Sequence, residues 1–325
     1  MSTTSHYRRP AVAGAVLVAA LALSACGQSA SGTDTDAGSS NGDTITIEAN
    51  NGELTVPVNP ERVVVLDNTA METVRDLGVT PVALPKPLLP APVHEEWLAD
   101  EDILDVGNHR EPNLEIVSEA QPDLIIGGQR FEEYTEELER IAPVVDLAPV
   151  DGEYVESLRH QTETLGAIFE QEDVAAELVA DLDEAVAAAV DATDGESVFL
   201  AVASGGKIDN GAGRIGRLIE PLSLVDVFTG EELDADSVHQ DSGLAPETVA
   251  QLDPEWMIVL DRDAATTAAA EAQPARALID AQEAWADTTF ITEDQVIVLD
   301  AYFYTREGIH AYTEAFRQIA EAFGA

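Results

Sequence analysis

Short apolar runs alternate with longer amphipathic segments along most of the chain after residue 43. Apolar runs of about four to eight residues are typical of buried strands, and apolar positions at helical spacing indicate helices. Strands are expected at 62–67, 81–84, 144–147, 197–203 and 295–299, after a hairpin at 44–56. Helices are expected at 69–77, 131–141, 154–169, 172–192 and 307–323. Strands that alternate with helices predict an α/β fold with mainly parallel sheets.

Two stretches that begin 132 residues apart are similar enough to be copies of one unit. Residues 115–130 and 247–262 have Glu, Val, Pro, Ile and Arg at the same spacing. In each copy an acidic residue opens a short helix, proline ends it, and an apolar run predicts a buried strand. Arg130 or Arg262 then stands at the strand's C-terminal end, where open α/β sheets bind ligands. We therefore expect two similar lobes that direct arginines at a shared cleft.

The segment 171–193 is predicted to be one helix of roughly six turns, about 30 Å long at 1.5 Å per residue. That length is enough to connect two lobes as a rigid spacer. The expected organisation is an N-terminal lobe over 44–170, this interdomain helix, and a C-terminal lobe over 194–325. The fold class predicted is thus two Rossmann-like lobes joined by one long helix.

The N-terminus has the pattern of a targeting segment. Arg8 and Arg9 precede a short apolar run, and Leu23-Ser24-Ala25-Cys26 resembles a bacterial lipobox. Cys26 is the chain's single cysteine, so an internal disulfide is impossible. We interpret residues 1–25 as a lipoprotein signal peptide and 26–43 as a flexible tether anchored by lipid at Cys26, on the extracytoplasmic face of the cell membrane. The alternative is an ordinary secreted protein in which this cysteine is incidental.

The charge balance is strongly acidic, with 62 acidic against 16 basic residues and a formal net charge of −46. A surface of this sign repels phosphate groups, which excludes nucleic acid and anionic membrane surfaces as partners. We interpret the excess of acid as a solubility feature. Arginines that are kept at strand ends are conspicuous against this background.

Arg130, Arg214 and Arg262 lie at the ends of expected strands or in the Gly-rich loop 205–216. A guanidinium group stays charged, presents a planar fork of donors and stacks on aromatic rings. Three of them around one cleft would suit an anionic, aromatic ligand. The competing interpretation is that each arginine pairs with a nearby carboxylate of a very acidic protein. The Gly-rich loop lacks the residues of a P-loop, so we expect its backbone to approach another element closely.

Three further residues are candidate ligands for a ferric ion, namely His239, Tyr302 and Tyr304. Imidazole and phenolate can both bind this hard ion, and phenolate matches it better. A loop histidine more often has a surface or hydrogen-bonding role. No cluster at metal-ligand spacing occurs, which argues against a closed site made by the protein alone.

Glu115 and Glu247 open the helices of the two repeat copies. The helix dipole stabilises an acid in that position and explains either residue by itself. Their equivalence suggests in addition a pair of negative charges for a two-fold symmetric partner. Catalytic motifs are missing from the sequence: there is no nucleophile elbow, zinc-protease helix or nucleophilic cysteine. We therefore expect a binding protein and not an enzyme.

Taken together, these features resemble the class III substrate-binding lipoproteins of ABC importers for ferric siderophores, cobalamin and haem. The resemblance covers residue 44 to the end and is nearest to the catecholate branch, the enterobactin- and petrobactin-type binders. Its markers are Pro60-Glu-Arg-Val-Val-Val-Leu-Asp67, Leu77-Gly78-Val79, Glu111-Pro112-Asn113-Leu114-Glu115, Pro122-Asp-Leu-Ile-Ile126 and the long central helix. Leu84-Pro85-Lys86 and the arginine, histidine and tyrosine candidates match the catecholate branch.

The resemblance implies that a ferric siderophore binds in the interlobe cleft and is delivered to a dimeric ABC permease. Arg130, Arg214 and Arg262 would surround the catecholates, with Lys86 as a further contact. His239 and either Tyr302 or Tyr304 would complete iron coordination, and Glu115 and Glu247 would dock on the permease. Ferric iron would arrive as part of the ligand, with no permanently bound cofactor and a monomeric protein. Ile215 and Arg217 depart from the more aromatic pattern expected beside Arg214.

Two alternatives remain open on the sequence. A haem- or cobalamin-binding protein would keep the fold and change the ligand, with His239 or Tyr302 as an axial ligand of haem. A surface-anchored enzyme would use His239, Tyr304 and a carboxylate as acid and base.

Overall fold

The computed structural model describes residues 43–90, 93–108, 111–228, 244–265 and 272–324. The predicted signal peptide, Cys26, the tether and His239 lie outside these residues. The segment Gly42–Ala325 is one compact unit. None of the helices in the described ranges is long and apolar enough to cross a membrane.

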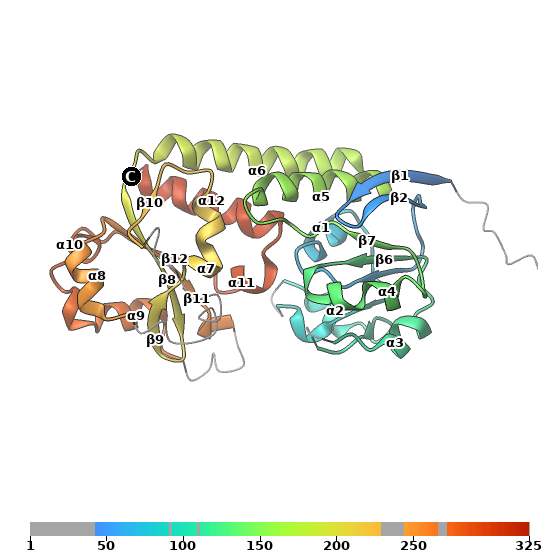
Figure 1. Ribbon diagram of the computed structural model, residues 1–325, viewed down its shortest axis with the longest axis horizontal. Helices are drawn as coiled ribbons and strands as arrows, with labels where there is room; N and C mark the ends of the chain where they lie inside the picture. The colour runs from blue at the N-terminus through green and yellow to red at the C-terminus, as the bar shows by residue number, and fades with distance from the viewer. Residues whose placement is uncertain (1–42, 91–92, 109–110, 229–243, 266–271, 325) are drawn as a thin grey trace, which may run out of the picture. The chain divides into compact units, whose positions relative to one another are not determined.

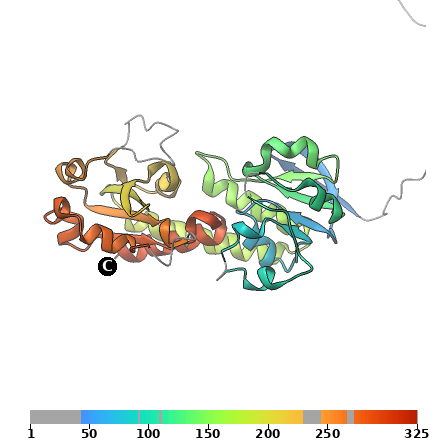
Figure 2. The same ribbon diagram turned by 90° about the horizontal axis from the view of Figure 1, so that it is seen from below.

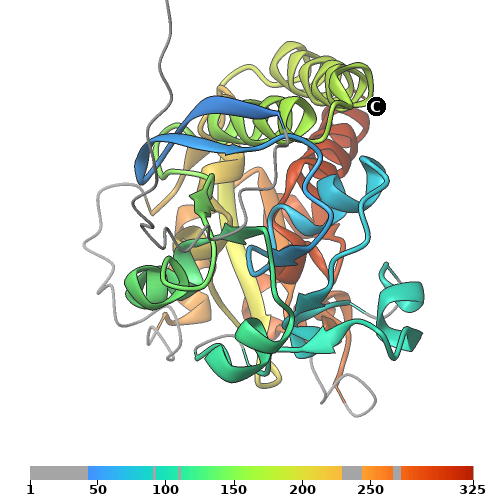
Figure 3. The same ribbon diagram turned by 90° about the vertical axis from the view of Figure 1, so that its right-hand side faces the viewer.

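The N-terminal lobe begins with the expected hairpin. Strands β1 (Thr44–Ala49) and β2 (Gly52–Pro57) pair antiparallel, and Gly52 takes a φ of +106° at the turn. The buried side chains of Ile47 and Val56 belong to the same core cluster as Leu165 and Ile168 of α5. Figure 3 shows the hairpin ribbon next to this helix. A ring nitrogen of His160 also lies 3.1 Å from the Glu48 carbonyl oxygen. The hairpin is therefore attached to the lobe through both apolar and polar contacts.

The sheet of this lobe is parallel throughout, with five strands in the order β5-β4-β3-β6-β7. Its strands are β3 (Val63–Val65), β4 (Ala83–Leu84), β5 (Leu104–Asp105), β6 (Leu124–Gly127) and β7 (Val144–Asp146). The α-helices between them are α1 (Met71–Asp76), α2 (Glu95–Ala99), α3 (Leu114–Glu119) and α4 (Thr135–Leu138). Two 3₁₀ helices complete the lobe, η1 (Lys86–Leu88) and η2 (Gln129–Tyr134).

Two long helices follow, α5 (Tyr154–Ile168) and α6 (Glu172–Ala192). Figure 1 shows α6 running past α5 at one end and past the C-terminal helix α12 (Ile309–Phe323) at the other. Gly166 allows α5 and α6 to pack closely, because a Cβ at that position would lie 2.5 Å from the Ala175 Cβ. The bounds of α6 agree with the predicted helix, and it is the long element between the two sheets.

The C-terminal lobe has the order β10-β8-β11-β12, all parallel, with β9 paired antiparallel to β8. Figure 2 shows the two lobes from a second side. The strands are β8 (Ser197–Ser204), β9 (Lys207–Asn210), β10 (Val225–Asp226), β11 (Trp256–Asp261) and β12 (Val296–Leu299). The α-helices are α7 (Ala212–Ile215), α8 (Pro246–Leu252), α9 (Ala275–Asp280), α10 (Thr289–Thr292), α11 (Phe303–Arg306) and α12. The 3₁₀ helices are η3 (Gly216–Ile219), η5 (Asp263–Ala265) and η6 (Glu283–Trp285).

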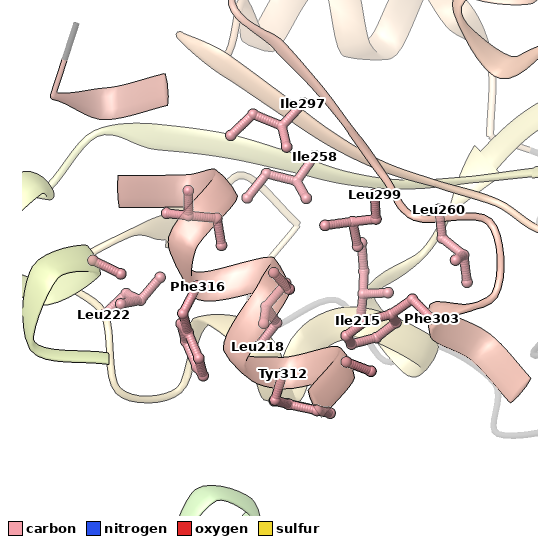
Figure 4. Close-up of a cluster of buried hydrophobic side chains, with 14 of the residues drawn as sticks. Ile215, Leu218, Leu222, Ile258, Leu260, Ile297, Leu299, Phe303, Tyr312 and Phe316 are labelled. Carbon is pink, nitrogen blue, oxygen red and sulfur yellow. The ribbon is translucent and has the colours of Figure 1, made fainter. Parts of the chain in front are cut away.

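Each sheet is covered by apolar side chains on both faces. On one face of the C-terminal sheet, Ile258 and Leu299 pack with Tyr312 and Phe316 of α12 (Figure 4). On the other face, Phe199, Met257, Val259, Trp285 and Phe290 form a second cluster. Strands that are buried on both sides must be apolar throughout, which is why β8 and β11 read as continuous apolar runs.

The predicted α/β architecture with mainly parallel sheets is confirmed, and several local predictions need correction. The helix expected over 307–323 is α12, which begins two residues later at Ile309, and a separate short helix, α11, precedes it across a break at Glu307 and Gly308. The segment expected as a helix over 131–141 is a 3₁₀ turn followed by one turn of α-helix. The lobe boundaries at 44–170, 171–193 and 194–325 stay a prediction.

The Gly-rich loop 205–216 contains structure that the composition did not indicate, strand β9 and helix α7. The expectation that its backbone approaches another element is confirmed at Gly211. A Cβ there would lie 2.5 Å from the backbone carbonyl carbon of Ala201 in β8. Glycine is therefore needed where the loop returns over the strand and brings α7 to the cleft.

Candidate ligand-binding site

A cleft of about 350 Å³ lies at the C-terminal ends of the strands in the N-terminal lobe. Helices α7, η3 and α11 of the C-terminal lobe line its other side. Segments that follow β3, β6 and β7 supply one side, as expected for an open α/β sheet. The lining residues come from both lobes and are Leu66, Asp67, Asn68, Thr69, Gly128, Arg130, Ala148, Pro149, Tyr154, Gly213, Arg214, Arg217, Tyr304 and Glu307.

Arg130 follows β6 and is positioned by Asn68. Its Nε donates to Asn68 Oδ1 at 3.0 Å, and Asn68 Nδ2 donates to the Thr305 carbonyl oxygen at 3.1 Å. Gly128 makes this close arrangement possible, since a Cβ there would lie 2.8 Å from the Asp67 Cβ. One predicted arginine is thus fixed in the cleft by a hydrogen-bond chain that joins the two lobes.

Arg214 and Arg262 both contact the ring of Tyr304. The guanidinium carbon lies 4.8 Å from the ring centroid for Arg214 and 5.6 Å for Arg262, within cation–π range. Arg262 Nη1 also donates to Ser204 Oγ at 3.0 Å. Arg214 lines the cleft, whereas Arg262 is not among the lining residues and lies at Tyr304. The structure therefore brings two predicted arginines together around the phenol of a third predicted residue.

These arginines change the acidity of the Tyr304 hydroxyl. Burial raises the pKa, but a hydrogen bond with Arg214 and the charges of Arg214, Arg130 and Arg262 outweigh burial, so the pKa lies below its usual value of 10.0. Phenolate, the form that binds ferric iron, is favoured by these same charges.

Arg217 is a cleft residue that the sequence interpretation treated only as a departure from an expected pattern. Its guanidinium carbon lies 5.0 Å from the Tyr154 ring centroid, and its Nε forms an ion pair of 2.6 Å with Asp151. Arg217 follows Arg214 by three residues, which places both on one side of a helical turn. That spacing is the signal that could have identified it.

Two carboxylates also line the cleft and were not predicted. Asp67 is 4% exposed and accepts from the backbone amide and hydroxyl of Thr69 at 3.0 and 2.8 Å, and from Gln161 Nε2 at 3.1 Å. Burial raises its pKa to about 6, although the bonds from Thr69 and the charge of Arg130 oppose the increase. Burial raises the pKa of Glu307 to about 7, against the opposing charges of Arg130, Arg217 and Arg214.

Other predicted residues lie elsewhere in the described part of the chain. Lys86 Nζ donates to the Asp100 carbonyl oxygen at 2.6 Å and does not line the cleft. Tyr302 is not a lining residue either, which separates it from Tyr304. Glu115 and Glu247 are exposed in the first turns of α3 and α8. Within the described residues, no group of three or more His, Cys, Asp and Glu could hold a metal ion.

The chain belongs to the periplasmic binding protein family, whose model matches residues 63–303. This span starts at β3 and ends in α11, so it includes both sheets, the long helix and most of the cleft. The prediction of a solute-binding protein that is not an enzyme is confirmed by this membership.

The sequence similarity to two relatives covers most of the chain. The petrobactin-binding protein YclQ of Bacillus subtilis is 28% identical over 319 residues, which is 94% of this chain and 96% of the relative. The ferric-anguibactin-binding protein FatB of Vibrio anguillarum is 26% identical over 280 residues, 82% of this chain and 83% of the relative.

Solved structures share the fold. The crystal structure of YclQ superimposes with a TM-score of 0.73 at 25% identity, over 87% of this chain and 99% of that chain. The siderophore-binding protein BauB, solved with two acinetobactin molecules and ferric iron, gives 0.75 at 23% identity, over 86% and 99%. The predicted class III periplasmic-binding-protein fold is therefore confirmed.

Proposed function

We propose that this protein is the extracytoplasmic solute-binding lipoprotein of an iron-uptake ABC transporter, and that it binds a ferric catecholate siderophore. The observation that carries the proposal is the grouping of Arg130, Arg214 and Arg217 with the Tyr304 ring in one cleft. The relatives YclQ and FatB are named for binding petrobactin and ferric anguibactin, which supports an iron-uptake binding protein.

The chemistry of the cleft suits this ligand. Catecholate oxygens are anionic acceptors for guanidinium donors, and the catechol ring can stack on a guanidinium plane. The cleft is partly shielded from water, so these nearby charges outweigh distant acids that salt screens beyond about 8 Å. A protein with a net charge of −46 can therefore still attract an anion locally.

Iron would be held as part of the siderophore, without a permanently bound cofactor. When a siderophore supplies only four donor atoms, Tyr304 and His239 would complete the coordination. Tyr304 is the better candidate of the two tyrosines, because it lines the cleft and its hydroxyl has a lowered pKa. Lys86, Tyr302 and Arg262 would act outside the described cleft lining, Arg262 by holding the Tyr304 ring.

The remaining partners follow from the outer surface and the N-terminus. Cys26 would carry the lipid that anchors the monomer to the membrane. Glu115 and Glu247 would dock on the two subunits of the permease, one from each lobe. Both side chains are exposed at equivalent helix starts, which supports a two-fold symmetric contact.

A fluorescence titration of residues 27–325 tests the function. Ferric complexes of a hexadentate catecholate, a tetradentate bis-catecholate and a trihydroxamate would be added, with haemin and cobalamin alongside. Trp97, Trp256 and Trp285 report binding by energy transfer to the coloured ligand. We expect tight quenching by the catecholates. A response to haemin or cobalamin alone would overturn the proposal.

A further inference from the structure

Glu307 occupies a strained position at the edge of the cleft. It lies in the break between α11 and α12 with a φ of +48°, a left-handed conformation that residues other than glycine rarely adopt. Its carbonyl oxygen accepts from Tyr154 Oη at 3.0 Å. Gly308 beside it packs so closely that a Cβ would lie 2.3 Å from the Thr69 carbonyl oxygen. The neighbouring contacts thus hold a glutamate where a glycine would be less strained, and such strain is concentrated at functional sites.

The Glu307 carboxylate faces the cleft arginines at long ion-pair distances. Oε2 lies 3.8 Å from Arg130 Nη2, and Oε1 lies 3.7 Å from Arg217 Nη1. Charge-assisted hydrogen bonds of this kind are usually about 2.7–2.9 Å long. The two guanidinium groups therefore lie close enough to be neutralised by the carboxylate, while their donors stay within reach of a ligand oxygen.

Groups from every surrounding element act on this carboxylate. They are Arg130 of η2, Arg214 of α7, Arg217 of η3, Asp67 after β3, Tyr154 of α5 and Tyr312 of α12. Of those that line the cleft, three are arginines, and Asp67 and Glu307 are the two acids. The lining has a formal charge of +1 when both acids are ionised and +3 when both are protonated.

We propose that Glu307 is a charge-sensing residue of the cleft: it stands in for an anionic ligand between Arg130 and Arg217, and it binds a proton when the ligand takes over these guanidinium groups. The inference rests on the proposed function and adds to it how the charge of the ligand and the pH determine binding. A ligand gains the arginines only by leaving the Glu307 carboxylate, whose side chain is 17% exposed, without its counter-charges, and protonation removes that cost. Highly charged ligands are thereby favoured at lower pH.

The acidity of Glu307 supports the proposal. Its pKa, raised by burial to about 7, already lies near neutral pH. An anion that replaces Glu307 as the partner of the arginines would raise the pKa of Glu307 further. By linkage, binding should then take up on the order of one proton above pH 7, and affinity should fall as the pH increases.

Calorimetry with the ferric complex of a tetradentate bis-catecholate tests this at pH 6 and pH 8, in pairs of buffers with different ionisation enthalpies. Wild type should take up a proton at pH 8, and Glu307→Gln should not. With a free-state pKa of about 7, the affinity of Glu307→Gln relative to wild type should increase by about tenfold between pH 6 and pH 8. The comparison with the variant removes the pH dependence of the siderophore itself.

Glu170→Gln is the matched control. Glu170 also has a left-handed φ, +51°, but it is exposed, lies outside the cleft and accepts from Asn59. Glu170→Gln should take up a proton at pH 8 as wild type does, and its affinity relative to wild type should not change between pH 6 and pH 8. Equal proton uptake and an unchanged affinity ratio in Glu307→Gln would overturn the inference and leave the proposed function standing. If no ferric complex binds to wild type, the proposed function fails and the inference fails with it.

Thermal melting over a range of pH, without ligand, provides a second test of the inference. The folded protein binds the Glu307 proton more tightly than the unfolded chain, because the pKa is raised from 4.5 to about 7. The resulting stabilisation is complete below about pH 4.5 and is lost as the pH rises through about 7. Wild type should therefore lose thermal stability relative to Glu307→Gln as the pH rises from 5 to 8. Parallel melting profiles would contradict a Glu307 carboxylate whose pKa is raised in the folded protein.

Discussion

The guanidinium groups of Arg214 and Arg262 lie 4.8 and 5.6 Å from the centre of the Tyr304 ring. The competing interpretation of the sequence is that each arginine only pairs with a local acid. Arg262 instead contacts Ser204 and Tyr304, whereas Arg130 and Arg217 do lie near Glu307. Pairing with a nearby acid therefore describes Arg130 and Arg217 but not Arg262, and the role of the predicted arginines in ligand binding stays a prediction.

Arg214→Ala should weaken binding of a ferric bis-catecholate by about 1–3 kcal/mol, the usual cost of losing a hydrogen bond to a charged group. The variant also removes a charge that lowers the pKa of Tyr304. Isothermal titration at pH 7 measures the change. Arg140→Ala is the control, since the Arg140 side chain is 68% exposed and pairs only loosely with Glu136 at 3.9 Å. Equal affinities for the two variants would remove Arg214 from the site.

Tyr304 should ionise below the ordinary range of a tyrosine. Arg214, Arg130 and Arg262 stabilise its phenolate and outweigh the effect of burial. A spectrophotometric titration of wild type minus Tyr304→Phe isolates the near-ultraviolet band of this phenolate. The difference should appear at a lower pH than the pKa of 10.0 of an ordinary tyrosine. Adding Arg214→Ala should move it upward, and an unmoved band would contradict the proposed charge contact.

The repeated helix–strand units show what the sequence could predict. In the first copy α3 precedes β6, and in the second α8 precedes β11, each with its arginine just after the strand. The prolines predicted where each helix ends, and the unbroken apolar runs predicted the buried strands. Strands β5 and β10 have two residues each, too few to show any period.

The cleft residues that were missed lie where the pattern is interrupted. Glu307 was placed at the start of the helix predicted over 307–323, but that helix begins at Ile309, and Glu307 lies in the break after α11. Asp67 was expected as the last residue of the buried strand 62–67 and was given no role in a site. Its burial depends on Gln161 and Thr69, and Gln161 lies 94 residues away, a contact that no local pattern can reveal.

Gly308→Ala tests the contact that separates α11 from α12. The new Cβ would lie 2.3 Å from the Thr69 carbonyl oxygen, so the backbone must shift. We expect a loss of about 1–3 kcal/mol in the free energy of unfolding, as for other overpacked sites. Urea denaturation measures it. At Gly216 a Cβ meets nothing within 4 Å and φ is not positive, so Gly216→Ala should be neutral or slightly stabilising. Similar stabilities for both variants would show that the 307–308 break can relax.

The two lobes are connected by more than α6. Asn68 donates to the Thr305 carbonyl oxygen, and a ring nitrogen of His310 lies 2.8 Å from Asp76 Oδ2. Arg306, which is 7% exposed, pairs with Glu72 of α1 at 2.6 Å and with Glu314 of α12 at 2.7 Å. The segment that carries Tyr304 and Glu307 is therefore attached to the N-terminal lobe both at the cleft, through Asn68, and outside it, through Arg306 and His310. We expect small hinge motion and a largely preformed cleft.

Arg306→Met should be among the most destabilising single changes in the molecule. It leaves Glu72, 5% exposed, as a buried charge without its main partner, which costs about 3–5 kcal/mol in comparable pairs. Urea denaturation monitored by circular dichroism gives the free energy of unfolding. Adding Glu72→Gln should recover a large part of the loss, because the double variant no longer buries an unpaired charge. If Arg306→Met unfolds within about 0.5 kcal/mol of wild type, the Arg306–Glu72 pair contributes little to joining the lobes, and the preformed cleft must depend on α6 and on the contacts of Asn68 and His310.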